Sequence, residues 1–312
     1  MSGKATVTVL NASAAEGRLV LTSNLVSDYW ALTKPEVNFL ILITTFAGFY
    51  LGRANAGRQF SLPALFNTLL GTLLVASGTA TLNQYIERKF DAQMRRTSRR
   101  PLAAGRLEPP AVLAFGIGLS VVGTVYLAIA AGVLTSLLAL FTLLSYLFLY
   151  TPLKRRTPLC VLVGAFPGAM PPLIGWAAAS GTLNVEACLL CCIVFLWQFP
   201  HFMAIAWMYR EDYDRAGYIV LPQGQLRFRL VVLQTIVPLL LLIALDLVPT
   251  LPGRLPFLYR VGALALSFVF FYCGAEFVLR SSRPAARRLL LASILYLPLL
   301  LSLMTIGEAQ RI

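Results

Sequence analysis

Charged residues are scarce in this chain. Asp, Glu, Lys and Arg make up 12% of its 312 residues, whereas hydrophobic residues make up 58%. This balance excludes an ordinary soluble domain, in which about a quarter of the residues are charged. The first 25 residues also lack the continuous apolar core and the cleavage site of a secretory signal. We therefore expect residues 1–27 to form a short cytoplasmic tail that is not cleaved.

Cysteine and histidine are also rare, with five cysteines and a single histidine. The cysteines lie in apolar segments and have no His or acidic partner at metal-ligand spacing, which argues against a metal or redox role. We expect them to fill the core. They are Cys160, Cys188, Cys191, Cys192 and Cys273.

Long apolar runs recur along the rest of the chain, each long enough to cross a bilayer. The sequence predicts an all-α polytopic membrane protein with nine transmembrane helices, in which residues 28–312 form a single domain. The predicted spans are 36–52, 62–82, 110–131, 133–151, 158–179, 186–208, 230–250, 257–279 and 287–306.

Basic residues are distributed very unevenly between the two sides that these spans define. Of the 26 Lys and Arg residues, 21 lie in the N-terminal tail and in the loops on its side. Because basic loops stay in the cytoplasm, we expect a cytoplasmic N-terminus and an external C-terminus. The net charge of +13 then reflects membrane orientation and anionic substrates, and it does not indicate nucleic-acid binding.

The segment 83–106 carries the most informative polar pattern. Asn83, Glu87 and Asp91 recur every four residues, which places them on one face of a helix. Oxygen ligands of this kind suit Mg²⁺, which proteins bind through a few carboxylates together with substrate phosphates. Seven bases follow that match phosphate oxygens, although the segment could also be a loop that only sets topology. They are Arg88, Lys89, Arg95, Arg96, Arg99, Arg100 and Arg106.

A second acidic cluster follows the sixth span, between Tyr209 and Arg215. Its acids are Glu211, Asp212 and Asp214. Two such clusters on one side of the membrane could hold a diphosphate between them through bridging metal. The alternative is a capped and solvated helix end.

Three further features allow two readings each. His201 lies inside a predicted span beside Pro200. It could contact a flat macrocyclic ligand, or it could hydrogen-bond to a backbone carbonyl that the proline leaves without its helical partner. The bases 154–156 could contact an anionic group or could only anchor the loop. The prolines and small residues of 164–176 break the fifth span, either at a cavity or at a close helix contact.

These motifs resemble the UbiA superfamily of intramembrane prenyltransferases, whose first acidic helix end reads N-x-x-x-D/E-x-x-x-D. The second acidic motif is shorter here than in the superfamily, which leaves open which of its acids binds metal. Within the superfamily, the chain is similar to the branch that farnesylates haem, although Cys160 stands where that branch usually has Asn. This narrower resemblance rests on Leu32–Pro35, Met94–Thr97, Arg100–Leu102, Tyr150–Thr151, Leu153–Arg155, Thr157, Pro171–Trp176, Pro200–Phe202, Tyr209–Tyr213 and Ala216–Gly217.

The resemblance implies a Mg²⁺-dependent enzyme of the plasma (inner) membrane, with its active site on the cytoplasmic side. It would join farnesyl diphosphate to haem b, giving haem O, and a downstream haem A synthase is a candidate partner. The implied catalytic residues are Asn83, Glu87, Asp91 and Asp212, and the implied metal ligands are Glu87, Asp91, Glu211 and Asp212. The implied substrate-binding residues are Arg88, Arg96, Arg100, Lys154, His201, Tyr209 and Arg210.

Two alternatives remain at this point. One is a related prenyltransferase with another acceptor, such as a hydroxybenzoate, a quinone precursor or a chlorophyllide. The other is a secondary transporter, which would place its charged groups near the middle of the membrane and not at one face.

Overall fold

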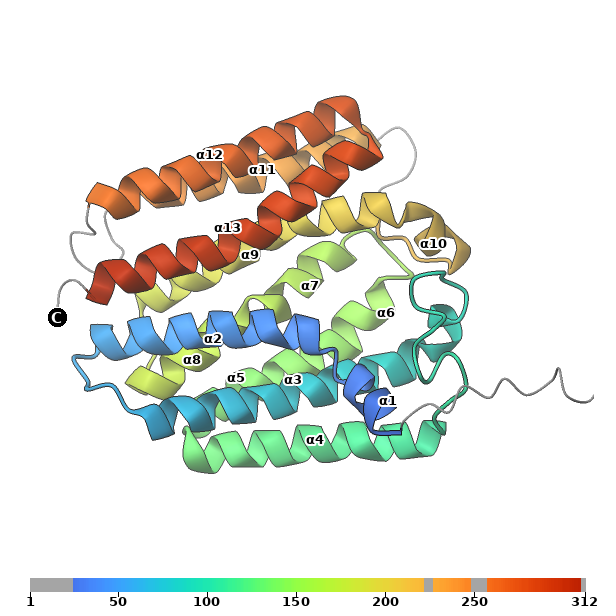
Figure 1. Ribbon diagram of the computed structural model, residues 1–312, viewed down its shortest axis with the longest axis horizontal. Coiled ribbons are helices and arrows are strands. Elements are labelled where there is room, and N and C mark those ends of the chain that lie inside the picture. The colour runs from blue at the N-terminus through green and yellow to red at the C-terminus, as the bar shows by residue number, and fades with distance from the viewer. Residues whose placement is uncertain (1–24, 222–226, 248–256, 310–312) are drawn as a thin grey trace, which may run out of the picture.

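The computed structural model describes residues 25–221, 227–247 and 257–309, and helices are the only regular elements in these ranges (Figure 1). They are α1 (Leu25–Leu32), α2 (Pro35–Asn55), α3 (Leu62–Asp91), α4 (Pro109–Ala130), α5 (Val133–Leu144), the π-helical turn η1 (Ser145–Tyr150), α6 (Thr151–Leu153), α7 (Cys160–Gly168), α8 (Met170–Ser180), α9 (Val185–Met208), α10 (Arg210–Arg215), α11 (Arg227–Leu247), α12 (Phe257–Arg280) and α13 (Arg283–Ala309).

The prediction of an all-α bundle with nine membrane spans is confirmed. Within the described ranges, nine helical stretches are long and apolar enough to cross a bilayer. The helix of the second predicted span continues past residue 82 to Asp91 and so carries the first acidic motif on a helical face, as expected. The short helix α1 was not predicted. The predicted tail, residues 1–27, lies largely outside the described residues.

Two of the spans are interrupted. The fourth contains the widened turn η1, after which Thr151 closes the chain back onto Tyr146 with a hydrogen bond of 2.8 Å. The fifth breaks at Ala169 between α7 and α8, as the prolines predicted. Gln198 of α9 donates to the Ala165 carbonyl at the break, at 3.0 Å. The break therefore serves close helix packing.

Glycines allow two helices to touch along their backbones. In the contact between α2 and α8, a side chain on Gly175 would collide with the Thr45 carbonyl, and one on Gly48 would collide with the backbone of Pro172. Small residues at such contacts are typical of membrane helices. Inside a bilayer the hydrophobic effect does not drive helices together, so close van der Waals packing must hold them.

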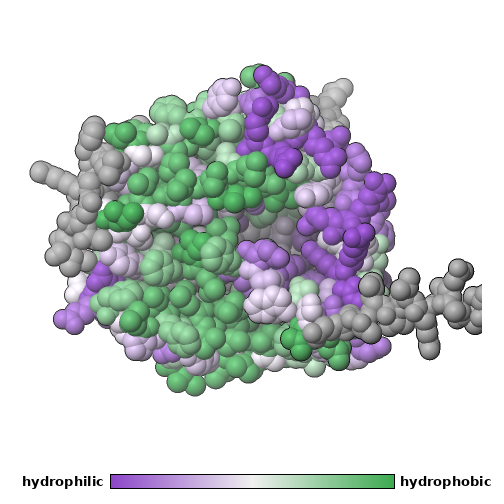
Figure 2. All heavy atoms as spheres, in the orientation of Figure 1, coloured by the Kyte–Doolittle hydropathy of each residue, from purple (hydrophilic) through white to green (hydrophobic). Residues whose placement is uncertain are grey.

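The polar elements gather at one end of the bundle. Figure 1 shows α6, α10 and the loop after α3 at the right of the view. Figure 2 shows hydrophilic side chains over this same end and a broad apolar surface over the rest of the face. This distribution fits a bundle whose middle lies in hydrocarbon and whose polar end meets water.

The cysteines only partly follow the expectation. Cys160 is buried in the core, but Cys188 and Cys192 are exposed on α9 and therefore do not fill it. A thiol is weakly polar and tolerates an apolar surround, so this placement costs little.

Candidate functional site

The last turns of α3 carry the first acidic motif on one buried face. Asn83 and Asp91 are each 1% exposed and Glu87 is 5% exposed. Buried carboxylates are costly unless they are paired or bind a metal. Each acid accordingly has a cationic partner, from a distant part of the chain for Glu87 and from the loop directly after α3 for Asp91.

Glu87 is paired with Lys154 from the loop after α6. Lys154 Nζ lies 2.9 Å from Oε1 and 3.2 Å from Oε2. Burial opposes the charge of this ammonium, yet the Glu87 carboxylate and neighbouring tyrosines raise the pKa of Lys154 well above its usual value. The ammonium also lies 4.6 Å from the centre of the Tyr150 ring and 5.9 Å from that of Tyr146.

Asp91 is paired with Arg100, but through one oxygen only. Arg100 Nη1 donates to Oδ2 at 2.7 Å. The other oxygen, Oδ1, is buried and has no hydrogen-bond partner among the described residues. The Thr97 hydroxyl donates to the Asp91 carbonyl at 2.9 Å, which holds the loop that carries Arg100. One oxygen of this buried carboxylate is thus left without a partner among the described residues.

Lys34 is part of the site, although no role was predicted for it. Its Nζ donates to Asn83 Oδ1 at 3.0 Å, and Asn83 in turn donates to Thr151 Oγ1 at 3.2 Å. Burial, together with the nearby Arg100 and Lys154 charges, lowers the pKa of Lys34 to about 7. The backbone at Lys34 is left-handed, with φ of 52°. A lysine placed directly before the proline that opens α2 was the available signal.

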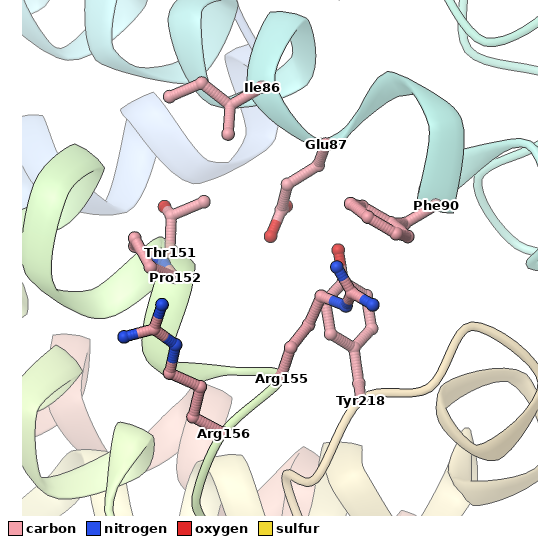
Figure 3. A pocket seen from close by; sticks show the side chains of 8 residues that line it. All are labelled: Ile86, Glu87, Phe90, Thr151, Pro152, Arg155, Arg156 and Tyr218. Carbon is pink, nitrogen blue, oxygen red and sulfur yellow. The ribbon is translucent and has the colours of Figure 1, made fainter.

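A pocket of about 400 Å³ opens beside Glu87. Figure 3 shows Glu87 and Tyr218 pointing into it from opposite sides, with Arg155 and Arg156 along its lower rim. Tyr218 is buried, and burial together with the Glu87 charge raises the pKa of its phenol. The remaining lining residues are Ile86, Phe90, Thr151 and Pro152.

The second acidic cluster lies against the loop after α3, and its acids have other partners than predicted. Asp212 is buried and accepts the backbone N–H groups of Arg95 and Arg96, at 3.2 and 3.3 Å, and a guanidinium N–H of Arg215 at 2.7 Å. Glu211 is 77% exposed at its side chain, and its nearest cation, on Arg210, is 4.0 Å away. Asp212 therefore holds the loop after α3 in place.

The predicted metal ligands consequently do not converge in the described residues. No group of three or more His, Cys, Asp or Glu side chains lies within reach of one metal ion there. Glu87 and Asp91 share the buried face of α3, whereas Glu211 points away from them into solvent.

The predicted phosphate-binding cations fall into two groups. Arg100 and Lys154 contact the buried acids. The other three stack on nearby rings, at 4.4 Å for Arg88 on Tyr85, 4.9 Å for Arg96 on Tyr209 and 5.3 Å for Arg210 on Trp207. Arg106, from the same basic run, makes a two-oxygen contact with Asp28 of α1.

His201 lies apart from these acids, where α9 packs on α13. Its Nδ1 is 2.8 Å from Ser293 Oγ, and its ring stacks on Trp197 at 4.7 Å. The predicted alternative, a bond to a carbonyl freed by Pro200, is not formed among the described residues.

Known proteins are similar to this chain over most of its length. Residues 41–298 match the UbiA prenyltransferase family. The chain is 47% identical to a protoheme IX farnesyltransferase of Solibacter usitatus, over 90% of this chain and 98% of that protein. It is 40% identical to one of Koribacter versatilis, over 92% and 94%, and 37% identical to one of Aquifex aeolicus, over 94% and 99%.

Solved structures share the fold at low sequence identity. A digeranylgeranylglyceryl phosphate synthase superposes with a TM-score of 0.73 at 16% identity, covering 91% of this chain and 99% of that one. A UbiA homologue from Archaeoglobus fulgidus, bound to GPP and Mg²⁺, gives a TM-score of 0.62 at 15% identity, covering 90% and 99%. With a matching family over most of its length and the same helical bundle, this chain belongs to the UbiA prenyltransferase family.

Proposed function

We propose that this chain transfers the farnesyl group of farnesyl diphosphate to a vinyl group of haem b, giving haem O, in a Mg²⁺-dependent reaction. The observation that carries the chemistry is the cluster of two buried carboxylates and three cations at the polar end of α3. The choice of haem as acceptor is supported by the full-length relatives, which are protoheme IX farnesyltransferases.

A magnesium ion fits the carboxylate face of α3. Asp91 Oδ1 is buried without a partner, and an unsatisfied carboxylate oxygen beside a second carboxylate is a donor set that suits a hard cation. Asp91 and Glu87 would hold the ion together with diphosphate oxygens. When bound, Mg²⁺ neutralises the charge that builds on the leaving diphosphate.

The cations of the cluster would bind the rest of the diphosphate. Lys154 and Arg100 already point at the carboxylates and would turn to the phosphate oxygens, while Lys34 on Asn83 supplies a third positive charge. Arg155 and Arg156 on the rim of the pocket would attract the anion from the aqueous end.

The reaction balances with water as the third reactant. The bond between C1 of the farnesyl chain and the diphosphate oxygen breaks, and the vinyl group attacks C1. Water adds to the neighbouring carbon and loses a proton, so haem b, farnesyl diphosphate and water give haem O and pyrophosphate. The Tyr146 and Tyr150 rings beside Lys154 would shield the developing allylic cation from other water.

We place the site on the cytoplasmic face of the plasma (inner) membrane, with the N-terminus on the same side, because most of the basic residues lie in loops at that end. Residues 28–312 would form one catalytic domain. The product is a lipid-soluble haem, so a membrane enzyme that consumes it, haem A synthase, is the expected partner.

The test is to incubate membranes that contain this chain with haem b, farnesyl diphosphate and Mg²⁺, and to weigh the extracted haems by mass spectrometry. We expect a farnesylated, hydrated haem that disappears with a chelator and with Asp91→Asn. The same membranes offered 4-hydroxybenzoate should give no prenylated product. A prenylated hydroxybenzoate without any haem product would overturn the choice of acceptor. Transport of a substrate across the membrane without any prenylated product would overturn the assignment as an enzyme.

A further inference from the structure

The hydroxyl of Ser293 on α13 has two close neighbours. Its Oγ lies 2.6 Å from the Leu290 carbonyl oxygen and 2.8 Å from His201 Nδ1. A carbonyl oxygen only accepts hydrogen bonds, so at this distance the hydroxyl hydrogen must point at Leu290. The hydrogen of the second bond must then come from the imidazole. Neutral His201 is therefore protonated at Nδ1, and its Nε2 carries a free lone pair.

The surroundings fix the plane of this imidazole. Trp197, one turn earlier on α9, stacks on it with an interplanar angle of 24° and donates its indole N–H to the Ser293 carbonyl at 2.8 Å. Phe202 closes another side at 5.7 Å. Ser293 thus binds Trp197 through its backbone carbonyl and His201 through its side chain.

Nε2 is left available by this arrangement. It has no hydrogen-bond partner among the described residues, and His201 as a whole is half-buried. A purely structural hydrogen bond between α9 and α13 would use only one ring nitrogen. It would give no role to the lone pair on the other nitrogen. An imidazole whose Nδ1–H is held by an acceptor, with Nε2 free, is the form in which histidine binds metals.

We propose that His201 Nε2 is the axial ligand to the iron of the haem acceptor, and that Ser293 is the residue that positions it. This inference rests on the proposed function and specifies how the same acceptor is held. His201 lies two turns along α9 from Tyr209, roughly 12 Å by the helical rise, and the Tyr209 ring stacks on Arg96 in the loop after the α3 acids. Iron is at the centre of the macrocycle and the vinyl groups are at its rim. A haem that extends from His201 toward Tyr209 would therefore bring the vinyl groups on its rim nearer to the acids.

The experiment uses two probes that differ only in the metal, ferrous haem b and metal-free protoporphyrin IX, added to the purified full-length protein. In the wild type, the nitric oxide adduct of the haem should show the electron paramagnetic resonance splitting of an axial nitrogen. His201→Ala should lose that splitting and bind haem more weakly, and added imidazole should restore the splitting. Binding of the metal-free porphyrin should change little, because it needs no axial ligand.

Variants of Ser293 test the positioning role. Ser293→Ala removes the acceptor for the Nδ1 hydrogen, so the splitting should persist while affinity for haem falls about tenfold, as for other groups that orient a metal-binding histidine. Ser293→Thr keeps the hydroxyl and should restore affinity. A purely structural Ser293 would instead weaken binding of haem and of metal-free porphyrin equally.

Failure of this inference is separable from failure of the proposed function. If the wild type farnesylates haem and His201→Ala keeps the axial splitting, His201 is not the ligand. If the wild type neither binds nor farnesylates haem, the acceptor itself is wrong. His201→Gln, with a side chain of similar size, replaces His201→Ala if that variant does not fold.

Discussion

Lys154 Nζ lies within hydrogen-bond distance of both oxygens of Glu87, at 2.9 and 3.2 Å, in a site where the carboxylate is 7% exposed and the lysine side chain 13%. Without substrate, the cation and the acid that we assign to diphosphate and metal therefore neutralise each other. Binding of a Mg²⁺–diphosphate would separate them, because each would then have a partner of higher charge. In the absence of substrate, this ion pair keeps both buried charges compensated within an apolar bundle.

Removing one member of this pair should be worse for folding than removing both. Lys154→Met leaves a buried carboxylate uncompensated, a change that typically costs about 3–5 kcal/mol. The double variant Lys154→Met with Glu87→Gln should recover most of that loss. Thermal unfolding in detergent measures the stability of the single and double variants.

Enzymatic activity, in contrast to stability, should not recover in the double variant. The double variant lacks both the cation for the diphosphate and the acid for the metal, so it should be as inactive as either single variant, despite its recovered stability. If prenyl transfer returned together with stability, the pair would be structural and the assignment of Lys154 and Glu87 would be wrong.

Asp212 and Glu211 are neighbours in sequence with opposite environments, which makes them a matched pair. Asp212 accepts the backbone N–H groups of Arg95 and Arg96, whereas the Glu211 side chain is largely in solvent. We expect Asp212→Asn to weaken the hold on this loop and to lower kcat/KM about tenfold or more, since hydrogen bonds to a charged acceptor contribute roughly 1.5–3 kcal/mol. Glu211→Gln should stay within twofold of the wild type.

The dependence on Mg²⁺ separates the two roles of Asp212. If it acts by holding the loop, the Mg²⁺ concentration for half-maximal activity should be unchanged in Asp212→Asn while the maximal rate falls. A large rise in the Mg²⁺ requirement would show that Asp212 is a metal ligand, as the sequence predicts. The same rise in Glu211→Gln would restore the full predicted ligand set.

Helical periodicity explains what the sequence could predict. Asn83, Glu87 and Asp91 recur every four residues, so their common face follows from the helix alone, and the long apolar runs determine the nine spans. The position of Lys154 near Glu87 could be anticipated only as a basic loop on the same side of the membrane. These predictions need no information about how the helices pack.

The other features depend on packing between distant segments. Lys34 reaches Asn83 only because α2 and α3 adopt a particular register, and Tyr218 reaches the pocket through a turn after α10. The backbone partners of Asp212 could not be predicted either. They require the loop after α3 to fold back onto α10, and a loop of mixed bases has no periodicity that reports its path.

Lys34 should give diphosphate binding a pH dependence near neutrality. Burial and the charges of Arg100 and Lys154 lower its pKa to about 7, with Glu87 and Asp91 opposing the shift only in part. With this pKa, the Lys34 side chain is mostly protonated below pH 7 and mostly neutral above it. A bound diphosphate favours the protonated form and raises the pKa. The affinity for the diphosphate should therefore be highest below pH 7. It should fall by up to about tenfold per pH unit as the pH rises.

The measurement is the Kd of a non-reacting farnesyl thiodiphosphate between pH 6 and 9, with Mg²⁺ present. Lys34→Arg keeps its charge throughout this range, because the guanidinium pKa is above about 12, so its affinity should be nearly flat. Lys34→Met should bind weakly at every pH and lack the dependence. Ionisation of the ligand itself affects all three proteins alike, so the difference between wild type and Lys34→Arg isolates the lysine. Parallel curves for these two proteins would mean that Lys34 keeps its proton across the range and that another group controls binding.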